Sequence, residues 1–334
     1  MLRIVFMGSD AIALPALNWL VTEARGLAEV VAVFTQPDRA VGRGQKIQPN
    51  EIKLWAEARQ LPVLQPAKVG AEERGQLASF APDLTLVMAY GHLLKQEMID
   101  TPRLGTLNLH TSILPKYRGA SPIQTAITCG EKETGVTLMR MVLKLDAGPV
   151  ADVERVPIGP LDTAATVEAK LAQACVPLLS RALPAIGAGA QTFTPQNEVD
   201  ATFCRRLDKN DGVLDFDAPA PVLAARVNGL MPWPACTVWI NGQTVKLGLA
   251  DSLNADATAA RGEVLASDAA GLLVGTALGT LRLRLLQRPG GRMLPASDFV
   301  RGFPVAAGTR LVSQPMPPLV GREPFPRLKN SKTL

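Results

Sequence analysis

The sequence predicts an α/β protein in which a domain with a mostly parallel sheet is followed by a small β-barrel domain. In the first half, short apolar runs alternate with stretches that suit helices, and in the second half five short strand candidates are separated by turn residues. The chain has 334 residues, which is long for one domain because domains usually contain about 100–200 residues.

The N-terminal half opens with a strand, a turn, a helix and a second strand. Residues 2–6 (LRIVF) and 30–35 (VVAVFT) are the strands, and residues 14–24 form the helix. This alternation is typical of a parallel sheet whose strands are joined by helices. Later strands are expected at 62–64, 84–89, 105–109 and 135–141, and helices at 52–59, 72–79 and 163–186.

The second half contains a strand with a basic face. In LRLRLL, Arg282 and Arg284 alternate with leucines, so a strand would bury the leucines and present both arginines outward. Small open barrels of about five strands commonly bind oligonucleotides on such a face, although an ordinary solvated strand would show the same pattern. The expected strands of this barrel are 236–240, 244–249, 262–266, 272–276 and 281–286.

Composition changes along the chain predict where the domains end. A stretch rich in Gly, Ala, Pro, Gln and Asn without periodicity is typical of a linker, and the proline-rich basic end predicts a flexible tail. The expected parts are a sheet domain at 1–189, a linker at 190–206, a barrel domain at 207–312 and a flexible basic tail at 313–334.

Charge is distributed unevenly. The net charge is +5, but residues 260–334 carry eleven basic and four acidic residues, a balance of +7. This asymmetry indicates a polyanionic partner such as nucleic acid, with a solvated basic face as the alternative. No apolar run approaches the roughly 20 residues that span a bilayer, so we expect a cytoplasmic protein without membrane contact.

Two classes of cofactor site are disfavoured. The four cysteines, Cys129, Cys175, Cys204 and Cys236, are scattered singly, which predicts buried free thiols and neither a metal site nor structural disulfides. The first turn lacks the later glycines of a dinucleotide-binding loop, and no phosphate-binding G-x-x-x-x-G-K-[ST] motif occurs.

The stretch NLHTSILPKYRG, residues 108–119, contains one of the chain's two histidines. Asn108 and His110 are two residues apart at the end of a predicted strand, so both side chains face the same way. Both can donate hydrogen bonds to an oxygen that gains negative charge, and Asp146 could orient His110, stabilise its cationic form and relay a proton. These residues predict acyl transfer, although a strand-end histidine with purely structural partners would give the same pattern.

A long connection follows the second strand. Residues 35–49, TQPDRAVGRGQKIQP, combine glycines with Arg39, Arg43 and Lys46 and are too many for a routine connection. Glycine hinges would let this loop move while its cations contact phosphates or base edges. The alternative is an exposed loop without function.

Several segments resemble the methionyl-tRNA formyltransferase family, and together they cover most of the chain up to Val312. The family usually has glycine where Thr111 stands and Thr-Pro-Asp-Phe at residues 9–12, and neither departure touches Asn108, His110 or Asp146. The segments are TQPDRAVGRGQK, VMAYG, NLHTSILPKYRGASPIQ, LDAG, LDKNDGVLDF and RVNGLMPWPA.

This resemblance implies an activity and a fold. The formyl group of 10-formyltetrahydrofolate would pass to the α-amino group of initiator methionyl-tRNA, on a Rossmann-like domain followed by a barrel like the oligonucleotide-binding (OB) fold. Asn108 and His110 would hold the formyl oxygen, and Asp146 would support protonated His110 and assist proton removal. A tetrahedral intermediate is implied, no metal is required, and we expect a monomer.

The resemblance also implies binding residues. Arg43 falls where the family's mobile loop carries an arginine that probes the acceptor stem, and Lys209 matches a basic position of the linker, whereas Arg282 and Arg284 are inferred from strand alternation alone. The folate pocket would be formed by Ser112, Ile113, Leu114 and Pro115 with Met88, Ala89 and Tyr90.

Two other functions compete with this one. The first is a folate-dependent formyltransferase for an amino-sugar nucleotide or a purine precursor, which would have no evident use for the cationic loop at 35–49. The second is a nucleic-acid-binding protein without catalysis, against which the presence of Asn108, His110 and Asp146 argues.

Overall fold

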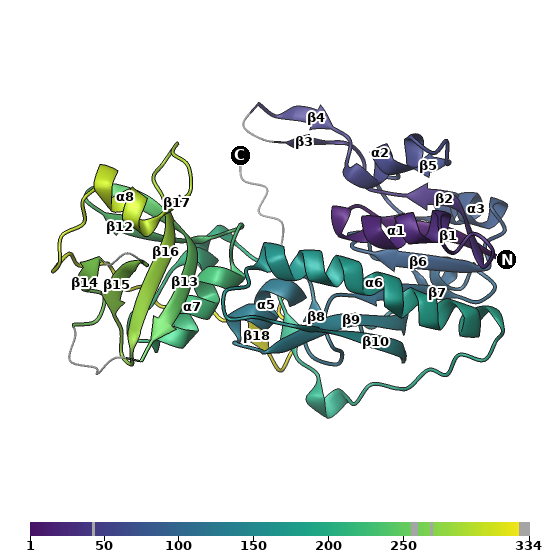
Figure 1. Cartoon of the computed structure of the whole chain (residues 1–334). Coiled ribbons are helices and arrows are strands. Elements are labelled where there is room, and N and C mark those ends of the chain that lie inside the picture. The colour runs from purple at the N-terminus through teal and green to yellow at the C-terminus, as the bar shows by residue number, and fades with distance from the viewer. Residues whose placement is uncertain (42–43, 255–259, 268–269, 327–334) are drawn as a thin grey trace. The chain divides into compact units, whose positions relative to one another are not determined.

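The computed structural model describes residues 1–41, 44–254, 260–267 and 270–326, which fall into two compact units (Figure 1). The first unit comprises residues 1–118, 135–156 and 168–201, and the second comprises 119–134, 157–167 and the chain from Thr202 onward. The domain boundaries expected from the sequence stay a prediction.

The first unit is built on a seven-stranded sheet with the order β10-β9-β7-β6-β1-β2-β5. The pairs β1–β2, β1–β6, β6–β7 and β2–β5 are parallel, while β7 and β9 are antiparallel. The carboxyl ends of β1, β2, β6 and β7 therefore meet at one edge, where α/β proteins bind ligands. The strands are β1 (Leu2–Gly8), β2 (Ala28–Phe34), β5 (Val63–Leu64), β6 (Leu84–Met88), β7 (Thr106–His110), β9 (Glu133–Arg140) and β10 (Val150–Pro157).

Helices cover both faces of this sheet. Val5, Val87 and the β2 residue Phe34 share a buried apolar cluster with residues of α3 and α4, while the next residue of β6, Met88, meets Cys175 of α6 on the opposite face. Successive side chains of a strand point to opposite faces, so the strands bury both sides. The helical elements of this part are η1 (Ala11–Ala13), α1 (Leu14–Val21), α2 (Glu51–Glu57), α3 (Ala71–Ser79), α4 (Gln96–Ile99) and α6 (Ala164–Gly187).

The long connection after β2 is a β-hairpin. Strands β3 (Arg39–Val41) and β4 (Lys46–Gln48) pair antiparallel, with Arg39 opposite Gln48 and Val41 opposite Lys46. The hairpin ends where the Asn50 side chain accepts a hydrogen bond from the backbone N–H of Lys53 and caps α2.

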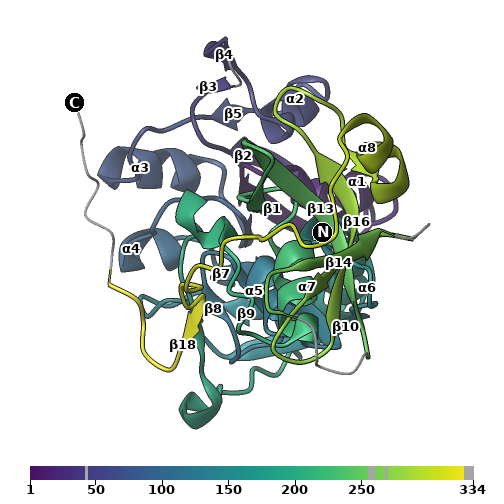
Figure 2. The ribbon, with the colours of Figure 1, turned by 90° about the vertical axis from the view of Figure 1, so that its left-hand side faces the viewer.

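The second unit contains an antiparallel sheet with the order β12-β13-β16-β15-β14, in which β17 also pairs with β16. Helix α7 packs against β13 and β16, and α8 packs against β16 (Figure 2). The elements are α5 (Pro122–Thr128), α7 (Ala220–Gly229), β12 (Cys236–Ile240), β13 (Gln243–Leu253), β14 (Val264–Ser267), β15 (Leu272–Gly275), β16 (Thr280–Gln287), β17 (Leu294–Pro295) and α8 (Ala296–Gly302).

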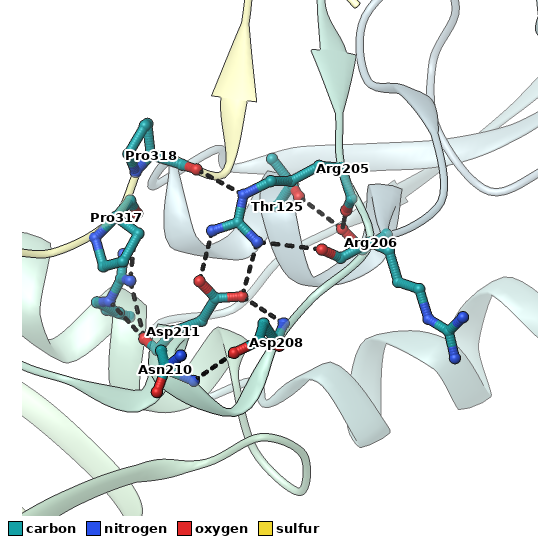
Figure 3. A network of polar contacts seen from close by, with 10 residues as sticks. Thr125, Arg205, Arg206, Asp208, Asn210, Asp211, Pro317 and Pro318 are labelled. Atoms are coloured by element: carbon teal, nitrogen blue, oxygen red, sulfur yellow. Dashed lines mark hydrogen bonds and ion pairs between the residues drawn. The ribbon is translucent and has the colours of Figure 1, made fainter. Parts of the chain in front are cut away.

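A network of polar contacts surrounds Arg205 in this unit (Figure 3). Its guanidinium group donates to both carboxylate oxygens of Asp211 and to the carbonyl oxygens of Arg206 and Pro318. The network thereby holds the chain at Pro318, two residues before a short strand. The remaining elements are β8 (Arg118–Gly119), η2 (Glu198–Asp200), β11 (Phe203–Cys204), η3 (Lys209–Gly212) and β18 (Val320–Gly321), of which β11 and β18 are antiparallel.

The predicted fold class is confirmed, since a mainly parallel α/β sheet is followed by an antiparallel sheet that curls into a half-barrel. All five strands expected in the second half are present, and the helix expected at 163–186 is α6. No helix in the described residues is long and apolar enough to cross a membrane.

Candidate active site

The carboxyl end of β7 carries two polar side chains on one face. Asn108 and His110 are the third and fifth residues of the strand, and they lie beside Val87 of β6 and Thr137 of β9, respectively. His110 is buried and Asn108 is partly buried. The structure thus places both residues at the strand edge where the sequence predicted them.

Both ring nitrogens of His110 face hydrogen-bond acceptors. Nδ1 lies 3.8 Å from the carboxylate of Asp146, and Nε2 lies 3.0 Å from the carbonyl oxygen of Tyr117. A neutral imidazole has only one N–H, so only the cationic ring can donate toward both acceptors. Asp146 therefore lies where its carboxylate can interact with a proton on Nδ1.

Asn108 has a different environment. Its amide makes no hydrogen bond within the described residues, whereas each nitrogen of His110 already faces an acceptor. Asn108 is therefore the donor that is free to meet an oxygen of a ligand, and His110 can reach such an oxygen only by sharing or releasing its contact with Tyr117.

Asp146 lies in the connection between β9 and β10, in a turn where its backbone has an unusual conformation. Its φ angle is 48°, a left-handed conformation that only a few per cent of residues other than glycine adopt. Strained residues of this kind often occur at active sites, where surrounding contacts hold them in place. The structure brings Asp146 to His110 although 35 residues separate them in the sequence.

The loop after β7, which contains Ser112, Ile113, Leu114 and Pro115, is held by one threonine. The hydroxyl of Thr137 donates to the carbonyl oxygen of Ser112 at 2.6 Å and accepts from the backbone N–H of Leu114 at 3.1 Å. The Ser112 hydroxyl closes the turn by donating to the carbonyl oxygen of Lys116. Three hydrogen bonds therefore fix the backbone of the predicted folate loop in this structure.

The second group of residues predicted to contact the folate lies at the end of β6. It consists of Met88, the last residue of the strand, and the next two residues, Ala89 and Tyr90. Ala89 has a φ angle of 49°, and its carbonyl oxygen accepts from the backbone N–H of Ser9. The Tyr90 carbonyl oxygen accepts from Ser9 and Gln36. The buried Tyr90 hydroxyl has no hydrogen-bond partner in the described residues, and burial raises the pKa of Tyr90 above its ordinary range. It remains protonated at neutral pH.

Comparison with known proteins identifies the family. The formyl transferase model matches residues 2–183, and the model of the formyl transferase C-terminal domain matches residues 206–304. A methionyl-tRNA formyltransferase of Ectopseudomonas mendocina (strain ymp) is 40% identical over 299 residues, which cover 89% of this chain and 94% of that protein. That of Pseudomonas fluorescens (strain SBW25) is 41% identical, with coverage of 89% and 93%. The chain belongs to the methionyl-tRNA formyltransferase family.

Solved structures that are less than 20% identical to this methionyl-tRNA formyltransferase family member share its fold. WlaRD, a sugar 3N-formyl transferase, aligns with a TM-score of 0.64 and 17% identity, covering 85% of this chain and 97% of that one. HypX from Aquifex aeolicus, in complex with tetrahydrofolic acid, aligns with a TM-score of 0.59 and 19% identity, covering 90% and 47%. At these identities the likeness concerns the fold alone.

The predicted tRNA-binding residues of this methionyl-tRNA formyltransferase family member lie on different elements. Arg39 and Lys46 are exposed on the β3–β4 hairpin, and Arg39 also donates to the side chain of Gln36. Arg43 lies outside the described residues. Lys209 is exposed on η3, a turn held by hydrogen bonds around Asp208 and Asp211 (Figure 3).

Arg282 and Arg284 are partly buried on β16 and share one carboxylate. Arg282 binds Asp251 through two hydrogen bonds, and Arg284 contacts the same group at 2.8 Å. The expected alternation with buried leucines is present at Leu281 and Leu283. Asp251 compensates one of the two positive charges. Strand periodicity could not predict this ion pair, because Asp251 lies on a different strand. Hydrogen bonds from Arg282 and then Arg284 hold the pKa of Asp251 well below its ordinary range.

Several residues of the site were not identified from the sequence. Tyr117 contacts His110 through its carbonyl oxygen, which carries no sequence signal. Thr137 has the pattern of an ordinary strand residue until the fold places it beside the 112–114 loop. Ser9 and Gln36 bind the 89–90 backbone from β1 and β2. In the sequence, only their position just after two predicted parallel strands indicates that they lie near the site.

Proposed function

We propose that this chain transfers the formyl group of 10-formyltetrahydrofolate to the α-amino group of methionyl-tRNA on initiator tRNA, which yields N-formylmethionyl-tRNA for translation initiation. Relatives named methionyl-tRNA formyltransferase, 40% and 41% identical over 89% of the chain, support the activity. The observation that carries it is the meeting of Asp146 and His110 at 3.8 Å, beside the free amide of Asn108.

Each of the three side chains has a role in the proposed reaction. 10-Formyltetrahydrofolate supplies an electrophilic formyl carbon, and the formyl oxygen gains negative charge when the amine attacks. Asn108 donates a hydrogen bond to that oxygen, a type of contact worth roughly 2.7–4 kcal/mol of transition-state stabilisation. The positive charge that His110 carries when protonated adds electrostatic stabilisation, and Asp146 fixes the ring and accepts the proton that the amine loses. When the tetrahedral intermediate collapses, the bond between the formyl carbon and N10 of the folate breaks, and N10 takes up that proton as tetrahydrofolate leaves.

The residues assigned to the folate fit a flat, polar ligand. The loop at 112–115 and the wall at 88–90 follow neighbouring parallel strands, so they border one edge of the sheet. The unpartnered hydroxyl of Tyr90 is a polar atom that a ligand against this wall could satisfy. Ser112 to Pro115 and Met88 to Tyr90 would hold the donor in this proposal.

The acceptor would be held by cations outside the catalytic residues. Arg39 and Lys46 are exposed on the hairpin, Lys209 is exposed on η3, and Arg43 completes the set by its place in the family motif.

A single tRNA acceptor requires one catalytic centre, so we propose a monomer acting in the cytoplasm, where translation begins.

Formyl transfer to several acceptors tests this function directly. Purified protein with 10-formyltetrahydrofolate should formylate initiator methionyl-tRNA, with little transfer to elongator methionyl-tRNA and none to a panel of amino-sugar nucleotides. Transfer to a sugar nucleotide would replace the proposed acceptor, and tRNA binding without transfer to any acceptor would favour a non-catalytic binding protein.

A further inference from the structure

The two acceptors that face His110 come from separate parts of the chain and are joined by a chain of contacts. Tyr117 supplies its carbonyl oxygen to Nε2, and Asp146 lies beside Nδ1. The residue after Tyr117 is Arg118, which contacts Gln196, and Gln196 contacts the turn that contains Asp146. The contacts form a closed ring that returns to His110.

Gln196 holds the turn of Asp146 directly. Its side-chain N–H group donates to the carbonyl oxygen of Asp146 at 2.8 Å and to that of Gly148 at 2.7 Å. These two carbonyl oxygens belong to the strained part of the turn, where Asp146 has a φ angle of 48°. Because both oxygens accept from one amide group, their separation is set by Gln196.

Arg118 in turn fixes the orientation of Gln196. It is completely buried, and its Nε and Nη2 donate to the side-chain oxygen of Gln196 at 3.1 and 2.8 Å. An arginine can only donate, so the amide must present its oxygen to Arg118 and its N–H group to the turn. A glutamine amide with both ends engaged is a rigid link.

Glu198 connects the same arginine to the start of the turn. Its carboxylate accepts from Arg118 at 2.9 and 3.1 Å and from Lys144, two residues before Asp146, at 2.6 Å. Further along this segment, Thr194 exchanges two backbone hydrogen bonds with Val150. Residues 191–198 thus bind the connection between β9 and β10 at several points and also bind the start of β10.

We propose that Gln196, oriented by Arg118, is a positioning residue that holds the Asp146 turn at the distance from His110 that the reaction requires. The inference rests on the proposed function, since it assigns a role in that reaction. Gln196 touches neither His110 nor the Asp146 carboxylate in the described contacts, so it acts through the backbone of the turn.

Two substitutions of Gln196 and one control distinguish a role in positioning the Asp146 turn from a role in the stability of the fold. Gln196→Glu keeps an oxygen that can accept from Arg118 but removes the N–H group that binds the two carbonyl oxygens, whereas Gln196→Leu removes both functions. Gln191→Leu is the matched control, because the Gln191 amide in the same segment also donates to two carbonyl oxygens, of Ala151 and Thr192, away from the Asp146 turn.

We expect both Gln196 variants to lower kcat by between about 10-fold and 100-fold, the effect of a small misplacement of catalytic groups, while KM for both substrates stays within about twofold. Gln191→Leu should retain wild-type kcat. In an Asp146→Asn background, Gln196→Glu should cost little further activity, because positioning is lost once its target is removed. Equal losses in Gln191→Leu and Gln196→Glu, or additive losses in the double variant, would overturn the proposal.

A spectroscopic measurement keeps this test independent of the proposed function. The chain has only two histidines, so the ring nitrogen NMR signals of His110 can be assigned with one His92→Gln variant. These signals should move in Gln196→Glu and stay in place in Gln191→Leu. If the wild-type protein formylated no acceptor, the proposed function would fail, yet unchanged His110 signals in Gln196→Glu would still overturn the positioning role on their own.

Discussion

Gly148 lies against the carbonyl oxygen of Arg140 so closely that no side chain fits at this position. A Cβ atom built on Gly148 would overlap that oxygen, and its next neighbour would be the carbonyl carbon of the same residue at 2.9 Å. Arg140 is the last residue of β9, so the backbone there cannot easily move. This contact holds together the two ends of the connection between β9 and β10, which contains Asp146.

Gly148→Ala is therefore expected to displace the Asp146 turn. The variant should lose stability by about 1–3 kcal/mol, the usual cost of forcing extra atoms into a packed site, and should lose most of its turnover. Gly26→Ala is the control, because a Cβ there meets nothing within 4 Å. Urea unfolding and formyl transfer measure both effects, and wild-type kcat in Gly148→Ala would show that the turn tolerates displacement.

The activity that we propose for Asn108, His110 and Asp146 should be separable from folding. Asn108→Ala is expected to lower kcat by about 10²–10³-fold, because it removes an amide donor that has no partner among the described residues. His110→Ala and Asp146→Ala should also reduce turnover sharply, while tRNA affinity stays nearly unchanged in all three. Steady-state kinetics and tRNA titration test this, and normal turnover in Asp146→Ala would exclude its proposed role.

Tyr90→Phe should have opposite effects on stability and on folate binding. The buried hydroxyl has no partner in the described residues, so its removal should leave the unfolding free energy of the unliganded protein unchanged or raise it by up to about 1 kcal/mol. The Kd for tetrahydrofolate should rise about fivefold or more, since a ligand contact is lost. Calorimetric titration checks the second effect, and an unchanged Kd would place the hydroxyl outside the folate site.

Glu198 should make stability depend on pH in the acid range. Hydrogen bonds from Arg118 and then Lys144 lower the pKa of Glu198 from 4.5 to about 2. The ionised form is thus favoured by folding, so its contribution is complete above pH 4.5 and is lost as the pH falls toward 2. The stability difference between wild type and Glu198→Gln, measured by urea unfolding, should shrink across this window. A difference that persists at pH 2 would contradict the assignment.

Asp251→Asn should strengthen the salt dependence of tRNA binding. The substitution removes the negative charge that Arg282 and Arg284 share, so a phosphate can neutralise the positive charge left uncompensated there. Each added phosphate contact steepens the slope of log affinity against log salt by about 0.7–0.9. Asp217→Asn, which removes the same charge beside Arg261, is the control. Equal slopes in the two variants would remove β16 from the tRNA surface.

Local patterns located most of the regular elements. The expected strand at 236–240 has the bounds of β12, and α6 begins and ends within one residue of the expected helix, because alternating or helical apolar spacing persists through both. The β3–β4 hairpin and α5 were not expected. Both are short polar or mixed segments in which neighbours in space, and not apolar periodicity, decide the structure.

The sequence by itself determined the chemistry available to this protein: a parallel sheet, an amide and an imidazole two residues apart at a strand end, and motifs that mark the methionyl-tRNA formyltransferase family. Only the tertiary structure decided which groups surround His110. The carbonyl oxygen of Tyr117, the amide of Gln196 and the guanidinium group of Arg118 act through contacts between residues up to 80 positions apart. Such contacts leave no local pattern, because a backbone oxygen is common to every residue and its use depends on what folding brings beside it.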